Sequence, residues 1–164
     1  MTANLTNIQE CTVDVSPLFL TLSATLATRI FNVTDPDEPV GFVHEDQDLR
    51  VEVTVTLNGT LVNYLCDTKL CVCLAFESCG SGPEGEICEF ITLEGDYDPC
   101  KTKTFVFDFD LPGGRLVAGP CGKQYDICIT LGSRDCCGIP GFVFGSCKDF
   151  HITVLPAVLD HPDN

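Results

Sequence analysis

The chain has 164 residues, 12 of them cysteine, and its 24 acidic and 9 basic side chains give a net charge of -15. Such a charge repels nucleic acids and anionic membrane surfaces, so we expect no binding to either. We also expect no membrane insertion, because no run approaches the ~20 apolar residues of a membrane-spanning helix.

The chain is expected to hold one domain. A globule of this length buries about 70% of its unfolded surface, enough for a core without covalent staples. Residues 1–16 are predicted to form an N-terminal arm or a first strand that carries Cys11, residues 17–156 a β-sandwich, and residues 157–164 a tail. The first ten residues lack the basic and apolar regions of a secretory signal, yet the cysteine content favours an oxidising destination. We therefore expect an extracellular location or one at a cell or spore surface.

The first half of the chain contains the clearest strand patterns. Strands are predicted at 11–15, 18–28 and 39–44, and in "VEVTVTL" the residues Val51, Val53, Val55 and Leu57 face one side. Asn58-Gly59 predicts a type I′ hairpin, because both residues tolerate the positive φ angles that this turn needs. With a further tight connection at 67–69, residues 51–76 are predicted to form a three-stranded meander.

Alternation in "KLCVCLAF" assigns its cysteines to a face. Leu70, Val72, Leu74 and Phe76 share the inward face, so Cys71 and Cys73 lie on the opposite face. The same pattern predicts that Phe105, Phe107, Phe109 and Leu111 point inward, while Cys128 and His151 point outward.

Further strands are expected at 88–93, 104–111, 123–132 and 149–155. Clusters of Gly, Pro and Asp separate these segments. The pattern predicts an all-β, disulfide-rich, two-sheet β-sandwich of about nine strands, of jelly-roll or immunoglobulin-like type.

The cysteine spacing argues against a metal-thiolate site. Zinc and iron–sulfur sites and thioredoxin-type centres depend on CxxC pairs, and this sequence contains none. The three histidines, His44, His151 and His161, are not close to a cysteine in the sequence. We therefore expect no metal and no cofactor.

Structural disulfides are the favoured role for eleven cysteines. Outward sulfurs on a strand can bridge to a neighbouring strand, or to a loop that folds over the outer face of the sheet. Loops at 77–88, 94–100, 112–121 and 133–147 are candidates for the second arrangement, and buried thiols are the alternative to both. Cys136 and Cys137 are adjacent, so we expect different partners for them. The predicted structural set is Cys66, Cys71, Cys73, Cys79, Cys88, Cys100, Cys121, Cys128, Cys136, Cys137 and Cys147.

The twelfth cysteine, Cys11, stands alone near the N-terminus. Complete pairing within one chain requires Cys11 to staple the N-terminal segment to the body. If Cys11 instead pairs with another subunit, an odd number of sulfurs remains, and a reciprocal head-to-tail link satisfies the count. Cys11 is therefore the candidate for an intermolecular disulfide.

Acidic clusters and loop serines give no clear site. Asp35, Asp37, Glu45 and Asp46 are weak calcium candidates, but no cluster follows the DxDxDG pattern, so solvated loops are the favoured interpretation. Ser81 and Ser133 lie in Gly-rich loops without a GxSxG motif. We therefore expect no enzymatic activity.

Two functions remain. The first is a non-enzymatic structural subunit of an extracellular or surface assembly, such as a filament, appendage or coat. It would form a homo-oligomer or polymer through β-strand addition and disulfide cross-links. The alternative is a monomeric, disulfide-stabilised binding module whose loops recognise a glycan, calcium or a protein.

Overall fold

The computed structural model describes residues 8–14, 22–34, 41–60, 62, 65, 67–94, 102–135 and 137–157. These residues form nine β-strands and no α-helix, which confirms the all-β prediction. Since no helix is found in the described residues, none there is long and apolar enough to cross a membrane. The strands are β1 (Ile8–Asp14), β2 (Ser23–Asn32), β3 (Phe42–His44), β4 (Leu49–Asn58), β5 (Lys69–Ser78), β6 (Gly85–Thr92), β7 (Thr102–Leu111), β8 (Lys123–Arg134) and β9 (Pro140–Leu155).

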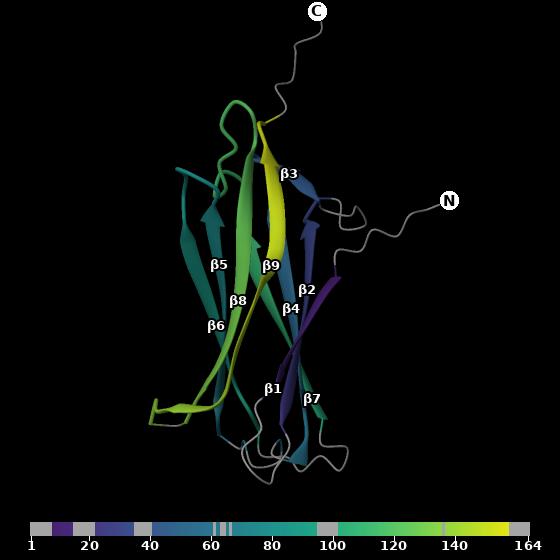
Figure 1. Cartoon of the computed structure of the whole chain (residues 1–164), viewed down its shortest axis with the longest axis vertical. Coiled ribbons are helices and arrows are strands. Elements are labelled where there is room, and N and C mark those ends of the chain that lie inside the picture. The colour runs from purple at the N-terminus through teal and green to yellow at the C-terminus, as the bar shows by residue number, and fades with distance from the viewer. Residues whose placement is uncertain are drawn as a thin grey trace, which may run out of the picture.

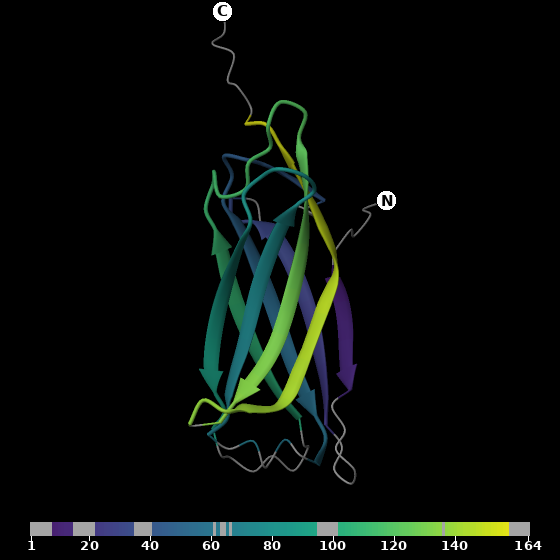
Figure 2. The ribbon, with the colours of Figure 1, turned by 60° about the vertical axis from the view of Figure 1, so that its left-hand side comes forward.

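Two sheets face each other along the long axis of the molecule (Figure 1 and Figure 2). One sheet has the antiparallel order β1-β2-β4-β7, and the other has the order β3-β9-β8-β5-β6. In the second sheet only β3 runs parallel to its neighbour, β9. The far end of the β8–β9 hairpin turns away from the body, at the lower left of both views.

The core lies between the two sheets and follows the predicted alternation. Val51, Val53, Val55 and Leu57 of β4 are completely buried. The opposite sheet contributes buried side chains at alternate positions of β5 and β8, and Phe105 of β7 is partly buried against them. Period-two burial therefore confirms the predicted faces of these strands.

The predicted hairpin at Asn58-Gly59 and the meander over 51–76 are wrong. Strand β4 already pairs with β2 on one side and β7 on the other, so it has no free edge for β5. After Gly59, whose φ is 123°, the chain passes to the other sheet. Val62 and Leu65 are buried along this connection and close the end of the core. The connection from β4 to β5 therefore crosses between the sheets.

The loop between β7 and β8 closes the opposite end of the core. Tyr125 is fully buried, and its hydroxyl donates to the Val117 carbonyl at 2.8 Å and accepts from the Val117 amide at 3.0 Å. Ala118 is buried, and its amide donates to Glu45 Oε2 at 2.9 Å. These contacts place the loop over the end of the sandwich, so the prediction that it covers the outer sheet face is wrong.

Residues 133–147 also differ from the predicted lid. They form the end of β8, a turn and the first half of β9. The buried Ser133 hydroxyl accepts a hydrogen bond from the Val143 amide across this hairpin at 3.0 Å. The predicted strand over 149–155 is therefore the second half of a longer strand.

Candidate functional site

Three cysteine sulfurs gather on the outer face of the five-stranded sheet. We call Cys71, Cys73 and Cys88 the sulfur cluster. Cys73 and Cys88 form a disulfide, and the Cys71 Sγ lies 3.4 Å from the Cys73 Sγ. All three sulfur atoms lie within 4.8 Å of one another. The cluster therefore joins a thiol to a disulfide at van der Waals contact.

Sheet geometry explains this arrangement. Cys71 and Cys73 are two positions apart on β5, so their side chains lie on one face. Cys88 lies directly opposite Cys73 on β6, with a Cα–Cα distance of 4.1 Å. Such close spacing is typical of a non-hydrogen-bonded antiparallel pair. The cross-strand pairing predicted for outward sulfurs is thus present at this position.

Among the described residues, the sulfur cluster is the group of His, Cys, Asp or Glu side chains with ligand atoms close enough to share a metal ion. Two of its sulfurs are joined as a disulfide, so only Cys71 retains a thiol that can ligate. Thiolates are the sulfur ligands that metals need. A shared metal would therefore require reduction of Cys73–Cys88 first.

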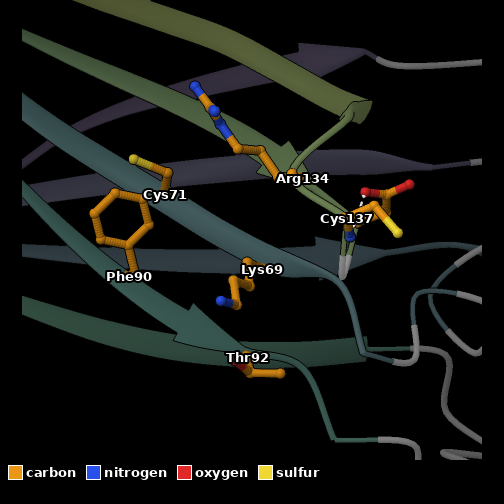
Figure 3. A pocket seen from close by; sticks show the side chains of 8 residues that line it. Lys69, Cys71, Phe90, Thr92, Arg134 and Cys137 are labelled. Atoms are coloured by element: carbon orange, nitrogen blue, oxygen red, sulfur yellow. Dashed lines mark hydrogen bonds between the residues drawn. The ribbon is translucent and has the colours of Figure 1, made fainter.

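A hollow of about 760 Å³ lies beside the cluster (Figure 3). Cys71 lies between the Phe90 ring of β6 and the Arg134 side chain of β8. A second hollow of about 470 Å³ also borders Cys71 and Arg134 and extends to the exposed Phe144. The first hollow is lined by Lys69, Cys71, Phe90, Thr92, Arg134, Asp135, Cys137 and Gly138.

The charges around the thiol oppose one another. Burial raises the pKa of the Cys71 thiol above its ordinary value, Arg134 lowers it, and Glu86 adds to the increase. Lys69 and Arg134 lie directly opposite each other in the β5–β8 register. The two cations outnumber the one carboxylate in the lining, Asp135, so the hollow is locally positive in an otherwise acidic chain.

The remaining described cysteines lie apart from this cluster. Cys128 is a half-buried thiol on the outer face, whereas Cys147 on the neighbouring β9 is buried in the core. Cys79 and Cys121 are exposed thiols, and the Cys79 Sγ donates to Asp126 at 3.7 Å. Among the described residues no disulfide partner is found for Cys79, Cys121 or Cys128, so disulfides for these three remain a prediction.

Of the five cysteines that remain, only Cys137 has a described side chain. Cys137 is exposed in the β8–β9 turn, where its amide donates to Asp135, but its neighbour Cys136 lies outside the described residues. Cys66 and Cys100 lie outside them as well, and for Cys11 only the backbone is described.

Of the four calcium candidates, the structure describes Glu45 and Asp46, and neither belongs to a group of described ligand atoms close enough to share a metal ion. Glu45 accepts hydrogen bonds from the amides of Ala118 and Ala157, so its carboxylate joins loops at the end of the sandwich. Asp46 is exposed, and Asp35 and Asp37 lie outside the described residues. The carboxylate of Glu45 therefore has a structural role that the sequence did not indicate.

The residues considered for catalysis also have structural roles. His151 lies on the outer face, as predicted, and its Nδ1 is 2.7 Å from Asp126 Oδ1. The Ser81 carbonyl accepts a hydrogen bond from the Lys123 ammonium.

Sequence reasoning missed most of the hollow. Lys69 lies two positions from Cys71 on β5, so alternation alone puts both side chains on one face, but Phe90 and Arg134 reach that face only through the pairing of β5 with β6 and β8. Their exposed apolar and cationic side chains carry no sequence signal of a shared site.

Comparisons with known proteins leave the family open. No family model matches the chain, and no curated protein matches it. Among solved structures, the chain is similar to the X-ray structure of Northeast Structural Genomics Consortium target SoR45, with 11% sequence identity and a TM-score of 0.33. The match covers 87% of this chain and 92% of that one.

Proposed function

We propose that this protein is a non-enzymatic structural subunit of an extracellular or surface assembly, such as a filament, appendage or coat. Copies associate by adding a β-strand to a sheet edge and are then joined by disulfides. The observation that carries this proposal is the edge strand β6, which combines an open side with a disulfide and an exposed aromatic ring.

The β6 edge has the properties of an acceptor. Strand β6 pairs with β5, and no described strand pairs with its other side. Unpaired backbone groups on such an edge are a template for another chain. The Phe90 ring on β6 is 61% exposed, and the adjacent Lys69 and Arg134 attract an acidic partner. The proposed donor segment of a second copy, β1, contains two acidic residues, Glu10 and Asp14, and no basic ones.

The donor is the N-terminal segment around Cys11. In the single chain this segment is β1, which lies along β2 from Ile8 opposite Arg29 to Asp14 opposite Ser23. The segment thus has the length and conformation of an edge strand. Transfer of such a strand between identical copies is a low-cost route to association. Cys11 then brings a sulfur to the joint.

We also favour the jelly-roll form of the sandwich over the immunoglobulin-like form. The chain passes between the sheets after β2, β3, β4, β6 and β7. Repeated crossing between two sheets accords with the paired Greek keys of a jelly roll.

Electrophoresis and electron microscopy test the proposal. We expect native protein to form a ladder on a non-reducing gel and extended particles in micrographs. Reduction should shorten the ladder, and Cys11→Ser should abolish it. Cys121→Ser is the matched control, because it removes an exposed thiol that the proposal does not use. Uniform small particles before and after reduction would overturn the proposal.

The hollow beside Phe90 favours one alternative, a monomeric binding module. Its lining combines an aromatic ring with two cations, which suits an acidic ligand better than calcium. A protein that stays monomeric and loses binding to an acidic glycan or peptide on Arg134→Ala would support this alternative.

A further inference from the structure

The sulfur cluster places a thiol in contact with a disulfide. Because the three sulfurs lie within 4.8 Å of one another, the Cys71 side chain must rotate to bring its sulfur into line with the S–S bond. The thiol of Cys71 is 3.4 Å from the Cys73 Sγ, and Cys73 is already bonded to Cys88. Disulfides exchange when a thiolate attacks one of their two sulfurs. We propose that Cys71 is the internal nucleophile that opens Cys73–Cys88 and presents the Cys88 thiol on β6 as a covalent attachment site.

The exchange needs no oxidant or reductant. Cys71 gives its proton to solvent, and its sulfur lone pair forms a bond to Cys73 Sγ. The Cys73–Cys88 bond breaks, and its electron pair leaves on the Cys88 sulfur, which then takes a proton. One thiol and one disulfide are present before the step and after it.

Strand geometry decides which pairing dominates. Cys73 and Cys88 are cross-strand neighbours with Cα atoms 4.1 Å apart. Cα atoms two positions apart on a strand are separated by about 6.6 Å, near the upper limit of about 6.8 Å for a disulfide. The Cys71–Cys73 form is therefore the minor one, and it accumulates only when another reaction consumes the Cys88 thiol.

The position of Cys88 indicates that its thiol reacts with a second copy of the chain. This step rests on the proposed function. Cys88 lies on the open edge strand, two residues from the exposed Phe90. Its thiolate attacks a disulfide that includes Cys11 of the second copy, forms the Cys88–Cys11 bond between the subunits and releases the former partner of Cys11 as a thiolate. Cross-linking thus follows docking and proceeds without new oxidant.

The surroundings of Cys71 hold the step back at neutral pH. Burial raises the pKa of the thiol, and only the thiolate reacts. The charged groups that border Cys71 are Lys69 on its own strand, Glu86 on β6, and Arg134 and Asp135 at the end of β8.

Alkylation followed by peptide mapping tests the exchange within a single chain. Unreduced protein is incubated with N-ethylmaleimide, quenched with acid and digested with a protease that cleaves after glutamate. Cleavage at Glu77, Glu84 and Glu86 separates the β5 cysteines from Cys88. We expect the share of maleimide on Cys88, relative to Cys71, to be larger at low reagent concentration than at high concentration, because a fast reagent captures Cys71 before exchange.

The labelling rate should rise about tenfold per pH unit below the pKa of the thiol. Cys71→Ser and Cys71→Ala should abolish Cys88 labelling, whereas Cys128→Ser, which removes another half-buried thiol of this face, should retain it. Circular dichroism confirms that each variant folds. Equal Cys88 labelling without Cys71, or no Cys88 labelling in the wild type, would overturn the inference. Because the readout lies within one chain, it does not depend on whether copies assemble.

Discussion

Removal of one buried hydroxyl, in Tyr125→Phe, should destabilise the fold measurably. The Tyr125 side chain is completely buried, and its hydroxyl makes two hydrogen bonds to the backbone of Val117. Each bond contributes about 0.5–1.5 kcal/mol net. The Val117 side chain is exposed, so water can reach part of the freed backbone, and the full desolvation cost does not apply. We expect a loss of about 2 kcal/mol in the free energy of unfolding.

Urea unfolding followed by far-ultraviolet circular dichroism measures this loss. With a slope of about 2 kcal/mol per molar, the midpoint should fall by about 1 M. Thr104→Val is the control, because it removes an exposed hydroxyl whose contact with Thr56 is 3.4 Å long. Its effect should stay within about 0.5 kcal/mol. If Tyr125→Phe lowered the free energy of unfolding no more than this control, the hydroxyl would not hold the loop between β7 and β8, and the reasoning would be refuted.

Three further predictions concern packing and charge. Leu74→Ala removes a fully buried side chain of β5 and should cost about 2–5 kcal/mol by urea unfolding, whereas a loss below 1 kcal/mol would contradict the placement of the core. Gly113→Ala places a Cβ 2.4 Å from the Asp46 carbonyl oxygen and should cost about 1–3 kcal/mol, while Gly132→Ala, with open space around it, should cost less in the same assay. The hydrogen bond from Arg50 at 2.6 Å holds the pKa of the Asp110 carboxyl below its ordinary value, so the pair stabilises the fold above about pH 4 and loses this effect as pH falls through the folded pKa. The small stability gap between the wild type and Asp110→Asn should therefore vanish at low pH, and a gap that persists there would contradict this reasoning.

Local sequence patterns predicted which face of a strand each side chain occupies better than they predicted which strands pair. The inward sets of β4 and β5 followed from alternation alone, because the side-chain period of a strand is set by its own backbone. Partners depend on which edges remain free, so the Asn58-Gly59 signal gave a wrong hairpin between strands of different sheets. The first half of β9 was missed because Pro140 and several glycines interrupt the alternation, and the β8–β9 register shifts there.

The same distinction applies to the sulfur cluster, of which one part was predicted and the other was not. That Cys71 and Cys73 share the outer face was predicted, and the structure confirms it. Their proximity to Cys88 depends on the register of β5 against β6, which a single sequence does not encode in any local pattern. A search for CxxC tests only cysteines that are close in sequence. It could not predict a cluster in which the sulfurs come from two neighbouring strands.

The two ends of the five-stranded sheet are unlike. At one end β3 pairs with only the last three residues of β9, and no described strand pairs with the rest of that β9 edge. At the other end β6 presents eight residues. An assembly in which each copy accepts the neighbour's β1 on its own β6 would add every copy in the same direction and would therefore have polarity. Capping β6 alone would then arrest growth, and a short peptide matched to that edge would act as a chain terminator at substoichiometric amounts.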